Sequence, residues 1–224
     1  MPTVLFVHCD GTNGSTTFTD ASPSVHTLTP SLASVSTTNP KVGTGAANFA
    51  GSSAGISVGT PQTDFNFGSG QFTVEAWAYF TSTPAGVQAV VAQFGGASNL
   101  GWFFGMSSGN LTFFYSTTGT DNPSVAGAFS PTLNTWVYLT ADRDTSNVLR
   151  VYADGVVKAS ATVSATFFAS TQTCRIGNDN GAARGFPGKL DEIRVTKGTA
   201  LYGGPFTPPS SGSTFSNPIA FVVS

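Results

Sequence analysis

The sequence predicts an all-β protein, a two-sheet antiparallel β-sandwich, and three observations lead to this fold class. Short segments rich in β-branched and aromatic residues recur along the 224 residues. Clusters of Gly, Ser, Asn and Asp separate them, and no stretch of helical length shows a 3.6-residue apolar period. Hydrophobic residues make up 40% of the chain, including 19 Phe, which is enough to fill one sizeable core between two sheets.

The clearest strand is expected over residues 72–80, where two kinds of residue alternate. One face would carry Phe72, Val74, Ala76, Ala78 and Phe80, and the other Thr73, Glu75, Trp77 and Tyr79. Further strands are expected at residues 4–7, 87–94, 102–106, 111–116, 136–141, 149–153, 156–158 and 189–196. Asp154-Gly155 predicts a hairpin between two of them, because a type I′ turn needs two residues that tolerate positive φ.

Charged residues are scarce and exclude two classes of partner. Nine Lys+Arg and eleven Asp+Glu make up 9% of the chain, where a typical soluble domain has about 25%. Nine scattered cations cannot form the basic stripe that nucleic-acid binding needs, so no nucleic-acid partner is expected. No apolar run approaches the ~18 residues of a membrane span, so no membrane partner is expected either.

The two cysteines, Cys9 and Cys174, each stand beside apolar or β-prone residues. We expect both to be buried free thiols, as in a protein made in a reducing compartment. A disulfide between them is the alternative.

Four ordered motifs resemble those of a known superfamily. Residues 64–77, 135–155 and 186–195 are similar to the central strand, the tryptophan strand with its hairpin, and the closing strand of laminin-G-like, concanavalin A-like jelly rolls. Residues 197–209 resemble the tail of the bacteriophage members. The resemblance covers residues 4–209 and implies the fold; it does not decide the activity, because lectins, hydrolases and adhesion modules share this fold.

No enzymatic activity is expected. Hydrolases of this fold typically carry E-x-D-x-x-E or a close variant, and glycoside hydrolysis needs two carboxyls flanking the bond. The only glutamates, Glu75 and Glu192, have no acid two residues away, and Asp191 next to Glu192 would point to the opposite face. We therefore expect a structural role for Glu75. His8 and His26 are too few for a histidine-based zinc site.

A structural calcium ion is the cofactor that the sequence favours. On the predicted strand, Asp191 faces the same side as Ile193 and Val195, which is the side expected to face the core. A half-buried carboxylate there must be paired or bound to a cation. The resemblance implies a site formed by Asp10, a carbonyl group near Gly51, and Asp191, completed by water. The alternative is that Asp191 is hydrogen-bonded to backbone amides or paired with an arginine.

Carbohydrate binding would need exposed aromatic rings. The candidates for glycan contact are Tyr79, Trp102, Tyr115 and Tyr202. For each of them a place in the core is the alternative, since aromatic residues normally fill the space between two sheets. Trp77 and Trp136 are assigned to the core. Arg143, between two aspartates, is expected in a solvated loop.

The chain is expected to divide into a jelly-roll domain, residues 1–209, and a Ser/Gly linker with an apolar tail, residues 210–224. An uncharged β-prone tail needs apolar cover, so we expect it to dock on its own domain or to add a strand to a neighbouring subunit. The residues expected at this subunit contact are Phe215, Ile219, Phe221 and Val223.

Together these features predict a non-enzymatic bacteriophage virion protein, either decorating the capsid or belonging to a tail or fibre. Its first residues lack the cationic region of a signal peptide, whereas its Ser/Thr-rich, charge-poor composition suits work outside cells. A virion protein made in the host cytoplasm fits both. It would act by adhesion to other virion proteins, as a homo-oligomer, with weak binding of cell-surface glycans. The alternatives are a soluble carbohydrate-binding lectin or adhesin domain and, least favoured, a glycoside hydrolase.

Overall fold

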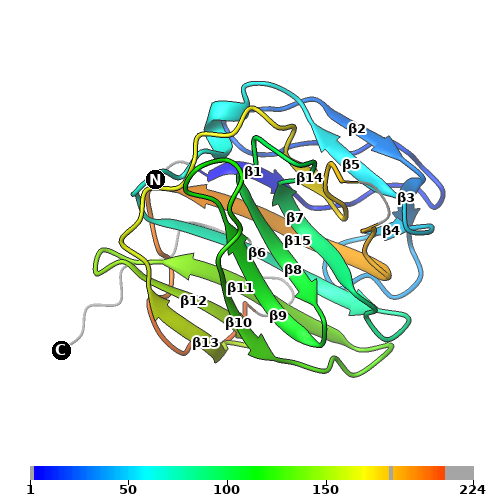
Figure 1. Cartoon of the computed structure of the whole chain (residues 1–224). Coiled ribbons are helices and arrows are strands. Elements are labelled where there is room, and N and C mark those ends of the chain that lie inside the picture. The colour runs from blue at the N-terminus through cyan, green and yellow to red at the C-terminus, as the bar shows by residue number, and fades with distance from the viewer. Residues whose placement is uncertain (1–2, 182–183, 210–224) are drawn as a thin grey trace.

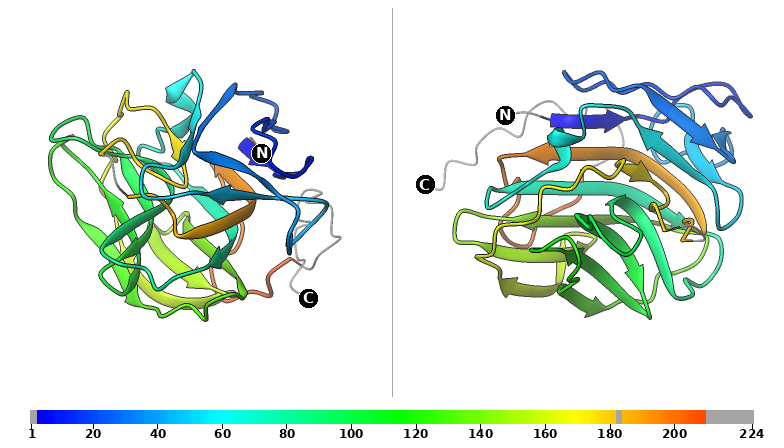
Figure 2. Two further views of the ribbon diagram at one scale, coloured as in Figure 1. Left: turned by 90° about the vertical axis from the view of Figure 1, so that its right-hand side faces the viewer. Right: turned by 45° about the horizontal axis from the view of Figure 1, so that its top comes forward.

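Two antiparallel sheets lie face to face in the computed structural model, which describes residues 3–181 and 184–209 (Figure 1). The view turned by 90° shows the two layers (Figure 2). The predicted all-β sandwich is confirmed. The predicted tail, residues 210–224 with Phe215, Ile219, Phe221 and Val223, lies outside the described residues.

The larger sheet has eight strands. In spatial order these are β13 (Val156–Thr162), β12 (Val148–Ala153), β11 (Trp136–Arg143), β6 (Phe72–Phe80), β15 (Gly188–Lys197), β4 (Ala46–Phe49) and β3 (Ala33–Ser36). The eighth, β1 (Thr3–Val7), pairs with β15 on the same side as β4. β15 therefore changes partner midway along its length.

The smaller sheet has seven strands. In spatial order these are β10 (Ser124–Ala128), β9 (Asn110–Tyr115), β8 (Trp102–Ser107), β7 (Val87–Gln93), β14 (Arg175–Ile176), β5 (Gly55–Val58) and β2 (Leu28–Ser31). A single 3-10 turn, η1 (Gln62–Phe65), is the only helical element among the described residues.

The core lies between the sheets and is rich in aromatic rings. The inner face of β6 carries the row that its alternation predicted, and all five side chains are fully buried. The ring centroid of Phe72 lies 4.2 Å from that of Phe67 and 5.1 Å from that of Phe113 on β9. Because aromatic rings bury large apolar areas, this stack joins the two sheets at their centre.

Six short strands lie outside the sequence expectations: β2, β3, β4, β5, β10 and β14. Each has two to five residues, and Ser, Ala and Gly are frequent in them. Over so few residues of this kind, alternation is too short a signal to predict a strand, and these segments are strands because neighbouring strands supply their hydrogen bonds. β2 also contains Pro30, which is tolerated because β2 is an edge strand.

Arg143 does not lie in a solvated loop; it ends β11 and is fully buried. Its guanidinium donates hydrogen bonds to the carbonyl oxygens of Gly68 (2.6 Å), Gly70 (2.6 Å) and Ala165 (3.2 Å). It also lies 4.2 Å from the ring centroid of Phe167. The expectation was wrong because β11 continues as far as Arg143, and loops that contain Gly68, Gly70 and Ala165 cover its side chain. Burial lowers the pKa of the guanidinium to about 10, so it stays charged at neutral pH.

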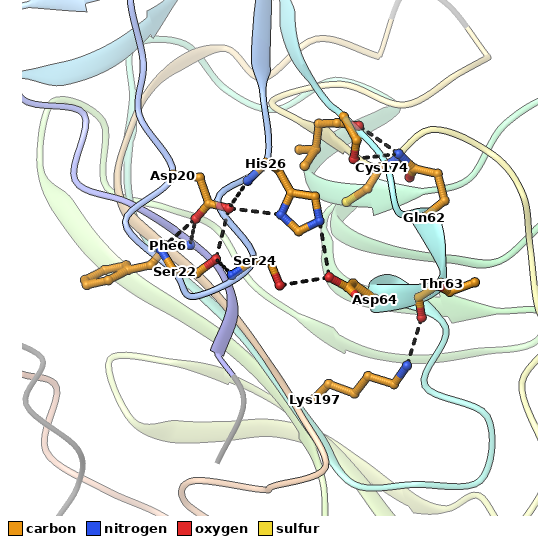
Figure 3. A network of polar contacts seen from close by, with 12 residues as sticks. Phe6, Asp20, Ser22, Ser24, His26, Gln62, Thr63, Asp64, Cys174 and Lys197 are labelled. Carbon is orange, nitrogen blue, oxygen red and sulfur yellow. Dashed lines mark hydrogen bonds and ion pairs between the residues drawn. The ribbon is translucent and has the colours of Figure 1, made fainter.

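A buried polar network holds the segment between β1 and β2 (Figure 3). The Asp20 carboxylate accepts hydrogen bonds from the backbone amides of Phe6 (2.9 Å), Ser22 (2.9 Å) and His26 (2.8 Å). It also lies 2.9 Å from Nδ1 of His26, whose Nε2 lies 3.3 Å from Asp64. Burial opposes the charge on Asp20, but the hydrogen bonds lower its pKa overall. His26 therefore has a structural environment.

Cys9 and Cys174 are both free and buried, which confirms the expectation of two free thiols. Burial raises the pKa of each thiol, so neither is a reactive thiolate at neutral pH. In the described part of the chain, no helix has the length and apolar character needed to cross a membrane.

The buried Arg143 gives a stability prediction. Replacing it in Arg143→Met leaves three carbonyl groups without their donor, so we expect the free energy of unfolding to fall by about 2–4 kcal/mol. Urea denaturation measures this. Lys158→Met is the control: it removes a partly exposed cation that has no ion pair among the described residues, and should change stability by less than about 0.5 kcal/mol. Equal effects of the two variants would contradict a structural role for Arg143.

Candidate functional site

A hollow of about 280 Å³ opens at the rim of the sandwich, where β6 ends and β15 begins. We call it the rim hollow; it is lined by Phe49, Gly51, Ser52, Thr81, Ser82, Gln88, Gly185, Phe186, Pro187 and Gly188. Glycine is required at Gly188, because φ is 152° and a side chain would collide with the carbonyl oxygen of Tyr79. The close backbone packing there shapes one wall of the hollow.

The lining of the rim hollow is polar without being charged. It offers the hydroxyls of Ser52, Thr81 and Ser82 and the amide of Gln88, whose Oε1 has no hydrogen-bond partner. No lining residue is an aspartate or a glutamate. The hollow can therefore hydrogen-bond a neutral polar ligand, but it lacks the paired carboxyls that glycoside hydrolysis needs.

Two partly exposed rings stand beside the rim hollow, on the outer face of the larger sheet. Tyr79 and Trp136 are directly opposite each other on β6 and β11, with ring centroids 5.3 Å apart. We call them the aromatic pair. Tyr79 lies two residues before Thr81 of the hollow. Trp136 was expected in the core; it is partly exposed because it is the first residue of β11 and points away from the other sheet.

Trp136 also borders a second, smaller hollow of about 110 Å³. This hollow is lined by Phe129, Ser130, Thr132, Thr135, Trp136, Val137 and Asp154. Its position means that the aromatic pair has polar groups on both sides.

The four predicted glycan-contact residues do not come together. Tyr79 belongs to the aromatic pair, but Trp102 is only 1% exposed and its indole N–H donates to the carbonyl of Phe65 at 2.7 Å. Trp102 is thus a core residue, because on β8 it faces the larger sheet. Tyr115 lies on the smaller sheet, half-buried, with its ring centroid 4.7 Å from that of Phe167.

Tyr202 has a structural position. Its hydroxyl donates a 2.7 Å hydrogen bond to Glu75, and its ring stacks on Phe206 with the centroids 3.5 Å apart. Glu75 also forms a buried ion pair with Arg194 on β15. These contacts fasten residues 198–206 across the outer face of the larger sheet, and they give Glu75 the structural role expected from the sequence.

A second segment crosses the same outer face nearer the rim. We call residues 37–45, which join β3 to β4, the strap. The carbonyl of Asn39 accepts a 3.1 Å hydrogen bond from the Trp136 indole, and the carbonyl of Thr38 accepts one of 2.5 Å from Lys189. The Lys41 ammonium lies 3.9 Å from the ring centroid of Trp77. The strap thus places a lysine and backbone carbonyls around the aromatic pair.

Asp191 lies on the opposite face from the one its parity predicted. A β-bulge between Asp191 and Arg194, with Glu192 at φ 50°, adds a residue, so Asp191 stands opposite Trp77 on the outer face. Its carboxylate accepts hydrogen bonds from the amides of Lys41 and Val42 (3.0 Å each) and Glu192 (2.9 Å). Burial raises its pKa to about 8, although these amide bonds act the other way.

The structure does not assemble the predicted calcium site. Asp10 accepts hydrogen bonds from the amides of Thr44 (2.5 Å) and Gly45 (3.2 Å). Gly51 lines the rim hollow, four residues past Ala47, which is the β4 residue opposite Leu190; it is therefore carried away from Asp191. Among the described residues no three His, Cys, Asp or Glu side chains form a group that could hold a metal ion. Both carboxylates have backbone partners in the structure, and the calcium ion stays a prediction that removal of metal can test.

Neither glutamate can act with a second carboxyl at the rim. Glu75 is buried with Arg194, and Glu192 lies 2.8 Å from Nδ1 of His8. Neither lines the rim hollow.

Removal of metal tests the calcium prediction. Because backbone amides already occupy the Asp10 and Asp191 carboxylates, we expect EDTA to leave the melting temperature unchanged, as followed by circular dichroism. Magnesium-saturated EDTA is the control for effects of the chelator itself. A melting temperature that falls with EDTA and recovers on addition of calcium would contradict this expectation. It would show that a calcium ion stabilises the fold.

Several solved structures share this fold. The binding domain of Paraclostridial Mosquitocidal Protein 1 has a TM-score of 0.67 at 12% identity, over 89% of this chain and 50% of that chain. The binding domain of botulinum neurotoxin serotype G has a TM-score of 0.66 at 14% identity, over 88% and 48%. The present chain thus spans about half the length of these structures, and at such identities the likeness shows the fold alone. No curated protein matches the sequence.

A family model matches residues 50–201, which is more than half of the chain. It is described as the Concanavalin A-like lectin/glucanases superfamily. The matched region contains β6, the hairpin at Asp154-Gly155 and β15, the same elements whose motifs resemble this superfamily. The chain therefore belongs to the Concanavalin A-like lectin/glucanases superfamily.

Proposed function

We propose that this chain is a non-enzymatic adhesion domain that binds carbohydrate at the rim, with a sugar ring lying on the aromatic pair. The observation that carries the proposal is the partly exposed pair of Tyr79 and Trp136 beside a hollow lined by hydroxyls and an amide. An aromatic plane covers the apolar face of a sugar ring, and a few placed polar groups bind its hydroxyls.

Binding without hydrolysis is supported by the charges at the rim. The rim hollow has no carboxylate in its lining, and Asp154 is the only acid that lines the smaller hollow. One carboxyl cannot serve as both acid and base across a glycosidic bond. The two similar solved structures described above are named as binding domains.

The setting we propose for this adhesion is the virion of a tailed bacteriophage, on the capsid or on a tail or fibre. It is supported by the low share of charged residues, 9%, since few ions must be desolvated when subunits pack closely. The chain would be made in the host cytoplasm and would bind other virion proteins and further copies of itself. Mass spectrometry of purified phage particles should find the protein at a fixed copy number. Its absence from the particles would contradict the proposed place in the virion.

Carbohydrate binding is tested on a glycan array. We expect Tyr79→Ala and Trp136→Ala each to weaken binding at least about tenfold, which corresponds to about 1.4 kcal/mol, because each removes half of the stacking surface. Tyr79→Phe and Trp136→Phe keep a ring and should retain most of the binding.

Tyr115→Ala is the matched control, since it removes an aromatic ring from the other sheet and should leave binding unchanged. Melting temperatures of all five variants show whether each is folded. If Tyr115→Ala abolishes binding while the variants of the aromatic pair bind normally, the site lies on the smaller sheet and the proposal is wrong.

A further inference from the structure

Lys189 is a largely covered lysine whose ammonium has no carboxylate partner among the described residues. Its residue is 9% exposed, and its ammonium donates one hydrogen bond, to the carbonyl of Thr38. It makes no ion pair with any described residue, whereas Arg150 and Arg184 lie 2.7 Å and 2.6 Å from their aspartates. Burying a charge without a counter-charge is costly, and burial lowers the pKa of Lys189 accordingly. The ammonium thus has one hydrogen bond and no counter-charge among the described residues.

The position of Lys189 puts this charge beside the aromatic pair. Its ammonium lies 5.4 Å from the ring centroid of Tyr79, one ring of the aromatic pair. An ammonium has three donors, and the bond to Thr38 uses one of them. Two donors and a full positive charge are left at the edge of the proposed sugar site.

Lys41 adds a second cation on the same face. It belongs to the strap, and its ammonium lies over Trp77, two residues from Tyr79 on β6. No described carboxylate forms an ion pair with it. The indole N–H of Trp77 is buried and has no hydrogen-bond partner. An indole N–H can only donate, so it adds a third donor to the two ammonium groups.

We propose that the carbohydrate bound at the aromatic pair is acidic, and that its carboxylate or sulfate group is held by Lys189 and Lys41. The inference rests on the proposed function and specifies its ligand. Charged oxygens accept several hydrogen bonds at once and form the stronger bonds with ammonium groups. Such a ligand would supply the missing counter-charge of Lys189.

The carboxylates nearby fix which end of the site the acidic group occupies. Asp191 stands opposite Trp77, but its oxygens are turned to the backbone amides of the strap. Asp154 lines the smaller hollow on the other side of Trp136, where it accepts a 2.9 Å hydrogen bond from the amide of Tyr138. The acidic group therefore belongs beside Lys189 and Tyr79, and a neutral part of the glycan beside Trp136.

The test uses an array on which each acidic oligosaccharide is printed beside its neutral counterpart. Uronic and sialic acids are paired with their methyl esters, and sulfated sugars with the desulfated forms. We expect the acidic form to bind at least about tenfold more tightly, as charged hydrogen bonds allow. The preference should shrink when salt is raised from about 0.05 M to about 0.5 M. Preference for the carboxylated or the sulfated set identifies the anion.

Lysine variants connect this preference to the site. Lys189→Met and Lys41→Met keep the aliphatic stem and should abolish the preference for the acidic form over its neutral counterpart. Lys197→Met is the charge-matched control: it lies at the other end of β15, more than about 20 Å from Lys189, and should keep the preference. Because Lys189 has no ion pair among the described residues, Lys189→Met should change the melting temperature little, which keeps the comparison between folded proteins.

The outcomes separate the two proposals. Equal binding of acidic and neutral forms, with loss of both in Trp136→Ala, overturns the acidic ligand and leaves carbohydrate binding standing. An acidic preference that survives in both lysine variants also overturns it. If the wild-type chain binds neither set, carbohydrate binding at the rim is wrong, and the acidic ligand with it.

Discussion

The buried ion pair between Glu75 and Arg194 is the constraint on which the outer face of the larger sheet depends. Two charges in the middle of adjacent strands need cover and hydrogen bonds, since an uncompensated buried charge is strongly destabilising. Tyr202 provides part of both, because its hydroxyl binds Glu75 and its segment lies across the sheet. The strap covers the same face from the other side. The rings of Tyr79 and Trp136 stay partly exposed at the rim.

The fold could be predicted because its long strands show their alternation in the sequence. The inner row of β6 and the hairpin at Asp154-Gly155 depend on local rules, and both are present as expected. The position of Asp191 could not be predicted in this way. Glu192 has left-handed backbone geometry and forms a bulge, so the residues before it face the opposite side of the sheet from the one that simple alternation predicts. No local signal in the sequence marks a bulge at a residue other than glycine. The buried Arg143 was missed because its acceptors come from two loops far away in the sequence.

The sequence predicted that aromatic side chains would form the candidate site, but it did not predict which ones. Aromatic residues were expected to matter, and Tyr79 is where the sequence suggested, but Trp102 and Trp136 exchange roles. Both begin a strand, so their sequence contexts are alike; one faces the opposite sheet and the other faces away from it. Exposure of a ring is decided by what covers it. The only usable signal for Trp136 was its place directly after a turn, at a strand end, where rims form.

The pairing of β1 with β15 has a consequence for how the molecule is made. The first strand of the described chain, β1, pairs with the last, β15. β15 also lies between β6 and β4 in the larger sheet. During synthesis on the ribosome, β1 therefore cannot form its hydrogen bonds to β15 until nearly the whole domain has been made. Contacts between such distant segments slow folding, because a long loop must close before they form. The sandwich is thus a structure that is completed late in synthesis, and its nascent chain is the form most exposed to aggregation.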